Sequence, residues 1–475
     1  MTNHILTDEK LQRSEKWRIV KNVGVISIAY MFFLTSYGGA ANLQSSINAE
    51  AGLGTASLAA VYAGGIFSTI FLSSLIINWL GAKWTMCCGI MMYVPYILSQ
   101  VYSKFYTLVP AGLFLGVGSA PIWCAVCTYL SVAAHAHSLI SKIPAKVLLQ
   151  TFFGYFYMVY QTGQIWGNLF SSLVLSVDNK PAVTSVNETM IPELCGANFL
   201  VGTDTHDNLP PQSPEKIQML SGVYLGCMFL SFAIIAIGLD SMKRYESCRE
   251  DTGNRLTGIA LLAATSKQLT NPDQLLFNAL SIFIGLEEAF LIADFTASFV
   301  SCVIGTGSVG YVMMTFGISD AAGCFVNGYL AKVFGRMSLV VSAFILHMGL
   351  LLTMLLWRPR AGDDYLLFLL ALLWGVSDSI WIVQINAYFG SVFHGKEEAA
   401  FSSLQLFVSL GYIIIFVFSS YVRTRYKIYL LMCSLILGMV GYFTLEYKHR
   451  NDRKITKEFE NLNKDNNQES VLLNA

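Results

Sequence analysis

The sequence predicts an all-α polytopic membrane protein whose twelve transmembrane helices form two six-helix bundles. Three observations support this: an excess of apolar residues, twelve long apolar stretches, and short motifs that recur in both halves of the chain. The 475 residues are 54% hydrophobic and only 13% charged, whereas soluble domains carry about 25% charged residues. This composition excludes a disordered chain and argues against a soluble enzyme. The balance of 30 basic and 30 acidic residues gives no net attraction to nucleic acid.

Each apolar stretch approaches or exceeds the roughly 20 residues that an α-helix needs to cross a bilayer. The stretches lie at 20–41, 58–80, 84–102, 108–133, 148–176, 218–239, 274–293, 308–333, 338–357, 365–390, 402–421 and 428–445. A charged segment separates the sixth from the seventh. We therefore expect an N-terminal tail (1–19), a first bundle (20–240), a linker (241–272), a second bundle (273–446) and a C-terminal tail (447–475).

Basic residues predict the orientation, because Lys and Arg concentrate in cytoplasmic loops. With the N-terminus inside, most of the 30 Lys and Arg residues fall on the cytoplasmic side, as do both termini. The local exception is Arg423, Arg425 and Lys427, which would lie outside. A glycosylation sequon at Asn187 falls in the longest predicted outer loop, which agrees with this topology. The tail after Lys448 is predicted to be disordered, since it has few apolar side chains to bury.

Short motifs recur in the two halves at equivalent places. The segment 116–123 (GVGSAPIW) in the fourth span corresponds to 374–381 (WGVSDSIW) in the tenth. After the eighth span, residues 328–336 read GYLAKVFGR. This string resembles a signature of the major facilitator superfamily, with Lys332 in place of its Asp. The resemblance implies two bundles around a central site, with structural or coupling roles for Gly328, Lys332, Gly335 and Arg336.

Longer strings resemble the Unc-93 family, and most closely its A-type, ion-channel-regulatory branch. They are residues 37–47 (YGGAANLQSSI), 165–173 (IWGNLFSSL), 356–360 (LWRPR) and 378–387 (DSIWIVQINA). The resemblance implies a regulatory or accessory subunit of another membrane protein, with a two-pore potassium channel as the expected partner. The expected location is the plasma membrane, with endosomal or endoplasmic reticulum membranes as alternatives. The alternative function is secondary transport of an unidentified small solute.

No arrangement of residues in the sequence is typical of an enzyme, a metal centre or a cofactor site. Cys124 and Cys127 lie one turn apart in an apolar helix without a second ligand pair, and zinc needs four converging ligands. His347 is alone in the ninth span and is interpreted as a structural residue, with a proton relay as the alternative. We therefore expect neither catalysis nor a bound cofactor.

The second half places several carboxylates within the predicted spans. Glu287 and Glu288 lie in the seventh span, Asp294 at its outer end, Asp320 in the eighth and Asp378 in the tenth. With no Lys or Arg expected inside a span, each carboxylate should be protonated, face a wet cavity or meet a cation. Two interpretations stay open. The carboxylates are either architectural or a proton or small-cation site in a central cavity.

For the functional interpretation, the candidate cavity residues are Glu287, Glu288 and Asp378, because spans seven and ten line the central cavity in the superfamily. Asp320 fits the structural interpretation best. Two cysteines, Cys195 and Cys302, lie in outer loops that meet an oxidising lumen during synthesis. They are predicted to form a disulfide, and two free thiols are the alternative.

Overall fold

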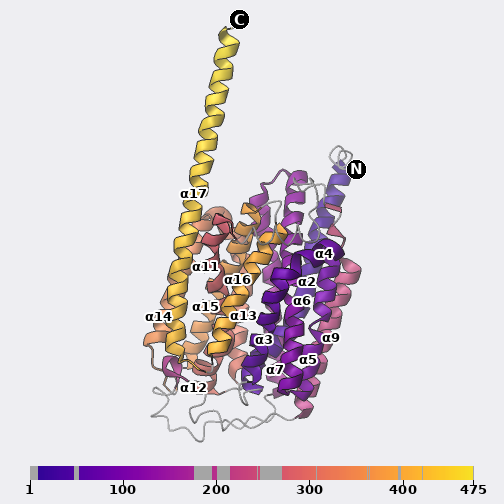
Figure 1. Cartoon of the computed structure of the whole chain (residues 1–475), viewed down its shortest axis with the longest axis vertical. Helices are drawn as coiled ribbons and strands as arrows, with labels where there is room; N and C mark the ends of the chain where they lie inside the picture. Colours follow the sequence, from indigo (N-terminus) through magenta and orange to yellow (C-terminus); the bar gives the residue numbers. More distant parts are fainter. Residues whose placement is uncertain are drawn as a thin grey trace.

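The computed structural model describes residues 9–47, 53–175, 195–200, 214–242, 244–245, 270–305, 308–360, 362, 364–393, 397–419 and 421–473. Over these residues the chain is helical, and the helices run side by side along one common direction (Figure 1). Two groups of helices, the first from the N-terminal half of the chain and the second from the C-terminal half, lie beside each other. This is the predicted all-α fold with two bundles.

The first bundle contains the helices up to the charged linker. They are α2 (Glu9–Ile47), α3 (Leu53–Phe71), α4 (Ser73–Met91) with its continuation α5 (Val94–Ser99), α6 (Phe105–Ser141), α7 (Ala145–Leu175) and α9 (Pro214–Gly238). Backbone hydrogen bonds continue through Leu72, from Leu72 N to Ser68 O and from Ile76 N to Leu72 O, both 2.8 Å. The break in helical geometry comes instead at Gly81, between the predicted second and third spans.

The second bundle repeats this arrangement after the linker. Its helices are α11 (Pro272–Ala289), which continues through the π-helical segment η8 (Phe290–Ser301) into α12 (Cys302–Ile304), then α13 (Val309–Val333), α14 (Arg336–Leu356), α15 (Asp364–Val392), α16 (Glu397–Phe418) and α17 (Thr424–Leu473). The η8 segment is unusual because π-helix normally occurs as single-turn bulges, often at functional sites.

Eleven helices of the described residues are long and apolar enough to cross a membrane, one fewer than predicted. The difference is α7, which is 31 residues long and packs along α2 and α13 inside the bundle. Its composition is more polar because it carries side chains such as Gln150, Gln161, Gln164 and Asn168. Gln150 hydrogen-bonds to Gln384 of α15, and Asn168 to Asn42 of α2. Such bonds between helices offset the cost of placing amides in the membrane.

A pair of glycines shows the internal duplication in the backbone. Gly81 has φ 75° and ψ 159°, and Gly335, just before α14, has φ 79° and ψ 154°. Only glycine adopts this region without steric cost. Residues 78–83 of the first half (NWLGAK) therefore make the same turn as the facilitator signature at 328–336.

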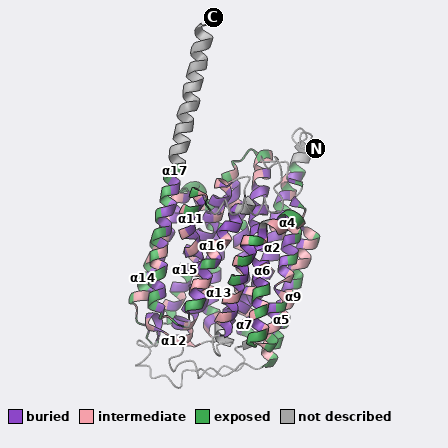
Figure 2. Cartoon of the chain, viewed as in Figure 1, coloured by how far each residue is buried: buried purple, intermediate pink, exposed green. Residues whose placement is uncertain are grey.

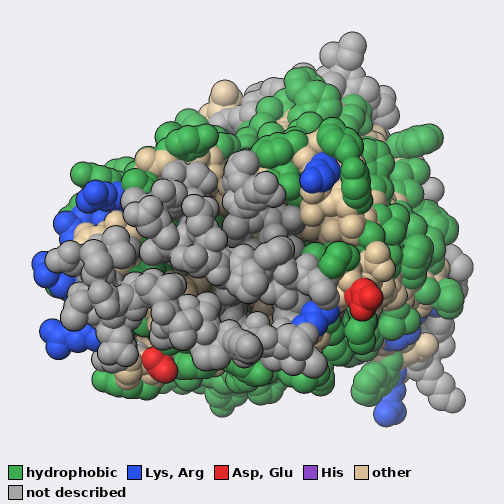
Figure 3. Space-filling view, turned by 90° about the horizontal axis from the view of Figure 1, so that it is seen from below, with side chains coloured by type: hydrophobic (Ala, Val, Ile, Leu, Met, Phe, Trp, Pro, Cys, Tyr) green, Lys and Arg blue, Asp and Glu red, His purple; other side chains and the backbone are tan. Residues whose placement is uncertain are grey.

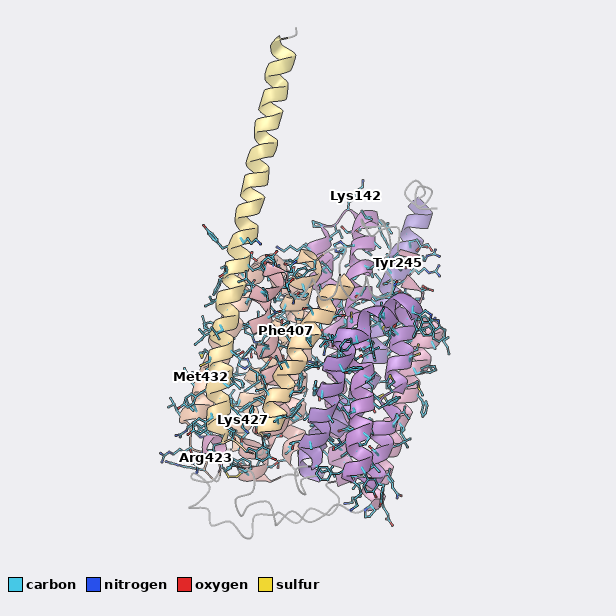
Figure 4. All side chains as sticks on the ribbon, in the orientation of Figure 1. Lys142, Tyr245, Phe407, Arg423, Lys427 and Met432 are labelled. Atoms are coloured by element: carbon cyan, nitrogen blue, oxygen red, sulfur yellow. A yellow bond between two sulfur atoms is a disulfide. The ribbon has the colours of Figure 1, made fainter. Side chains whose placement is uncertain are left out.

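Both chain ends emerge from the same end of the bundle, here called the terminal end (Figure 1). Lys142 and Tyr245 lie at the terminal end, whereas Arg423 and Lys427 lie at the opposite end (Figure 4). Buried residues concentrate on the helix faces that meet other helices, and exposed residues lie mainly on the outer faces (Figure 2). Seen from the end opposite the termini, the visible margin is mainly hydrophobic, with scattered charged side chains (Figure 3).

The prediction of a disordered C-terminal tail is wrong for its backbone, because α17 continues as a helix to Leu473. Figure 1 shows this part projecting beyond the bundle. Two physical reasons account for it. Lys, Glu and Arg are good helix formers, and a tail that extends an existing helix does not incur the cost of nucleation.

Candidate functional site

A cavity of about 170 Å³ lies between the two bundles. Its wall is formed by α2, α3, α6 and α7 of the first bundle and by α11, η8, α13, α15 and α16 of the second. The bundles touch most extensively along α7 with α13 and along α3 with α16, and all four of these helices contribute to the cavity wall. A cavity bounded by both bundles is where the facilitator fold places its central site.

Glu288 of α11 lines this cavity and is held at the contact between the bundles. The hydroxyl of Tyr412 in α16 donates a hydrogen bond to its Oε2 atom. The Tyr412 ring stacks on Tyr62 of α3, with centroids 3.9 Å apart and planes 9° from parallel. Glu288 is therefore linked through one tyrosine of its own bundle to the aromatic face of the other.

Asp378 of α15 also lines the cavity, with only 2% of the residue exposed. It lies in hydrogen-bonding contact with two further carboxyls, Glu287 and Asp320. Among the described residues, no N–H or O–H group is a donor to its Oδ1 atom. The cluster of Glu287, Asp378 and Asp320 can be joined only by shared protons, because two ionised carboxylates have no hydrogen to place between them.

Glu287 faces away from the cavity, although it precedes Glu288 in the chain. Its Oε2 atom accepts a hydrogen bond of 2.8 Å from the Trp374 indole. The same atom lies 3.6 Å from His347 Nε2, and His347 Nδ1 is 3.0 Å from Ser377 Oγ. His347 and Glu287 are both fully buried. The structure thus brings Glu287 and Asp378 together, but places only Glu288 and Asp378 on the cavity wall.

Asp294 of η8 is paired with a lysine, although the sequence predicts no Lys or Arg near the carboxylates of the spans. Lys427 at the start of α17 donates a hydrogen bond to Asp294 Oδ1, and Ser419 Oγ donates another of 3.0 Å. The sequence predicts an outer position for Lys427, because it falls between the eleventh span (402–421) and the twelfth (428–445). In the structure it is buried, since pairing with Asp294 offsets part of the cost of removing both charges from water.

Asp320 and the signature residues lie on α13 and at its junction with α14. Asp320 Oδ1 accepts a hydrogen bond of 3.4 Å from Cys324 Sγ, and the residue is fully buried. Gly328 packs close to the α7 backbone, whereas Lys332 is exposed near the end of α13.

Arg336, the last signature residue, is buried and contacts α15 and α17. It forms a 2.5 Å ion pair with Glu446 and donates a 3.3 Å hydrogen bond to the Tyr442 hydroxyl. Its guanidinium lies 3.5 Å from the centre of the Tyr388 ring. The signature arginine therefore connects three helices of the second bundle through both charge and aromatic contact.

The structure joins Cys195 and Cys302 by a disulfide at the end opposite the termini. Cys195 precedes η6 (Gly196–Asn198), a short segment contributed by the loop between α7 and α9. The Phe199 carbonyl accepts a 3.1 Å hydrogen bond from the backbone N–H of Thr424 in α17. A segment from the first bundle is thus docked on the second. The glycosylation site predicted at Asn187 lies outside the described residues.

Sequence reasoning missed the aromatic wall of the cavity. Tyr37, Tyr93, Tyr157 and Tyr160, among other rings, line it together with Trp123. The signal available was the repetition of aromatic residues one turn apart in the spans, as at 157 and 160. It was not decisive, because aromatic residues at helical spacing more often fill a core.

This two-bundle architecture, with its central cavity, defines a protein of the major facilitator fold. Residues 44–443 match the family described as "Ion channel regulatory protein UNC-93". The chain therefore belongs to the UNC-93 family, as its sequence motifs indicated.

Relatives support the same assignment over nearly the whole length. Protein unc-93 homolog A of Xenopus laevis is 34% identical over 452 residues, covering 94% of this chain and 98% of the relative. The human protein of that name is 33% identical, covering 90% and 93%. A Caenorhabditis elegans relative, named putative potassium channel regulatory protein unc-93, is 30% identical over 93% of this chain and 63% of its own length.

Solved structures show the fold alone, since their sequences are distant. FucP, a major facilitator transporter in an outward conformation, superposes with a TM-score of 0.60 at 12% identity, covering 90% of this chain and 99% of FucP. The human organic anion transporter MFSD10 gives a TM-score of 0.57 at 11% identity, covering 90% and 99%.

Proposed function

We propose that this protein is a non-enzymatic regulatory subunit that binds a potassium channel in the plasma membrane and modulates its gating or delivery. The observation that carries the proposal is the match of residues 44–443 to a family of ion channel regulatory proteins. The name of the Caenorhabditis elegans relative favours a potassium channel as the partner. A two-pore potassium channel is the partner that we would test first.

The geometry supports a regulator that acts through the arrangement of its two bundles. The bundles meet along α3–α16 and α7–α13, and the Tyr62–Tyr412 stack links the first contact to Glu288. A change in the protonation or occupancy of the cavity carboxyls would alter this contact. A partner channel packed on the outer helices would then experience a different membrane-facing surface.

Secondary transport is the second candidate, and the cavity is the observation that favours it. The cavity is bounded by both bundles and carries two carboxyls, Glu288 and Asp378. These are features that a carrier also requires. The fold by itself does not decide between the two functions, because one fold supports many.

One reconstitution can separate the two functions. The full chain is co-reconstituted in liposomes with a purified two-pore potassium channel, and potassium flux is compared with that of channel-only liposomes. We expect the chain to change channel flux and to remain bound to the channel during purification. Unchanged flux without co-purification would overturn regulation of that channel. Saturable uptake of a solute by liposomes that contain the chain alone would establish transport.

A further inference from the structure

The cavity has a chemistry that points to one class of ligand. Two carboxyls, Glu288 and Asp378, enter its wall from the second bundle. None of the described residues that line it is a Lys or an Arg. The Lys427 ammonium forms an ion pair with Asp294, and the Arg336 guanidinium forms one with Glu446. The cavity therefore lacks a resident cation to balance its carboxyls.

The surroundings of Asp378 also lack a positive charge. Its residue is 2% exposed, and its Oδ1 atom accepts no hydrogen bond from the described residues. An unsatisfied buried carboxyl oxygen costs free energy, so such atoms normally have a donor. Its neighbours Glu287 and Asp320 can share protons with it, but as acids they supply no positive charge. A cationic group bound in the cavity would supply the positive charge that these carboxyls lack.

The rest of the wall is largely aromatic and apolar. The rings come from both bundles, and they include Tyr37, Tyr62, Tyr157 and Tyr160 of the first and Phe316 and Tyr412 of the second. Ring faces attract cations that have lost their water, and this attraction is used to bind quaternary ammonium groups. A small hydrated metal ion instead needs several oxygen ligands. No group of three or more His, Cys, Asp or Glu suited to a metal occurs among the described residues.

We propose that the cavity binds a small monovalent organic cation. Its ammonium group lies between Glu288 and Asp378, and its apolar or aromatic body packs on the tyrosine rings of the first bundle. The volume of about 170 Å³ suits one aromatic ring with a small head group, because a cavity of about 150 Å³ binds benzene. The proposal applies to a regulator and to a transporter alike. Its test therefore uses binding, without a channel or a flux.

The test uses phenyltrimethylammonium, whose charge is permanent, and tert-butylbenzene, its neutral counterpart of the same shape. The purified full chain in detergent is dialysed against radiolabelled phenyltrimethylammonium, with unlabelled compounds as competitors. We expect saturable binding that unlabelled phenyltrimethylammonium displaces and tert-butylbenzene does not. Absence of saturable binding to folded protein, or equal displacement by the neutral compound, would overturn the proposal. This comparison needs no variant.

Variants then locate the site. Glu288→Gln and Asp378→Asn each remove one cavity charge, and we expect each to weaken binding at least about tenfold. Asp273→Asn is the matched control, because Asp273 lies on α11 as Glu288 does but pairs with Lys448 at the opposite end of the helix. It should leave affinity unchanged.

The aromatic part of the site has its own pair of variants. Tyr160→Leu should weaken binding, whereas Tyr160→Phe, which keeps the ring, should retain it. Each variant is first shown to elute as a single folded species. Folded carboxyl variants that bind as the original chain does would overturn the assignment of the charge site. Equal binding by the Leu and Phe variants would overturn the role of this ring.

Discussion

Lys427 of α17 and Asp294 of η8 form an ion pair in which the two side chains are only 3% and 2% exposed. The pair holds the start of the last helix against the π-helical segment of the seventh span. Ser419 at the end of α16 joins the same group through its side chain and its backbone carbonyl. Three separate segments thus depend on one charge pair.

Removing one partner of this pair should be more harmful than removing both. Lys427→Met leaves Asp294 buried without a cation, and we expect it to cost about 3–5 kcal/mol. The double variant Lys427→Met/Asp294→Asn should recover much of that loss. Thermal unfolding in one detergent measures both. The control is Arg423→Met, an exposed neighbour, which should stay within about 0.5 kcal/mol of the original chain. A Lys427→Met variant as stable as the control would contradict the prediction.

The close approach of α3 and α6 predicts a second effect on stability. A methyl group added at Gly116 would overlap the Val61 carbonyl oxygen, so Gly116→Ala should destabilise the protein by about 1–3 kcal/mol. Gly226→Ala in α9 is the matched control, because nothing lies within 4 Å of its new methyl group. It should be neutral or slightly stabilising, since alanine favours helix. Equal unfolding temperatures for the two variants would show that the helices can separate at little cost.

Asp240, just after α9, predicts a loss of stability in acid. Hydrogen bonds from Arg18 hold the pKa of its carboxyl well below the usual range, and Lys21 contributes. Because the folded-state pKa of Asp240 is depressed, the stability gained from its ionised carboxyl is complete above the unfolded pKa of about 4. This stability is lost as the pH falls from there through the folded-state pKa. For a partly exposed pair we expect up to about 1 kcal/mol at neutral pH.

The measurement compares the original chain with Asp240→Asn across this pH range. The difference in unfolding temperature should be present at pH 7 and should narrow below pH 4. Glu215→Gln, an exposed carboxyl of α9, is the control and should show a much smaller pH dependence. A difference that stays constant through acid would exclude the ionised Asp240 as its source.

The bond between Cys195 and Cys302 predicts a labelling pattern. Freshly purified protein is denatured with an alkylating reagent and without a reductant, then analysed by mass spectrometry. Cys88 and Cys433, which are free thiols, should be alkylated, whereas Cys195 and Cys302 should appear as one linked peptide pair. Cys195→Ser should expose Cys302 to alkylation and reduce stability by about 2–4 kcal/mol. Full alkylation of both cysteines in the original chain would disprove the bond.

Much of the fold could be predicted because membrane helices have a simple signature. Apolar length identified eleven of the spans directly, and the motif at 328–336 identified the turn at Gly335. The helix α7 was also located, although its amides make it less apolar than the others. The course of the tail could not be predicted, because composition does not reveal that α17 provides a ready template for its helix.

The candidate site was predictable only in part. The carboxyls were visible as rare charges in apolar spans, but which of them reaches the cavity depends on helix rotation. Glu287 and Glu288 are adjacent in sequence and point to different surroundings. His347 and Lys427 contact carboxyls 60 and 133 positions away. The spacing of residues in the sequence does not predict such contacts, because they form only when the helices pack.

The matching turns at Gly81 and Gly335 mark the two bundles as duplicates, yet their contributions to the cavity have become unequal. The first bundle contributes several tyrosines and, among its described residues, no carboxyl, whereas the second contributes Glu288 and Asp378. If two copies of the second bundle paired in the same way, four carboxyls would face one cavity. Two copies of the first bundle would place no carboxyl there. Charge therefore disfavours the pairing of two second bundles, and the first bundle is the partner that avoids this repulsion.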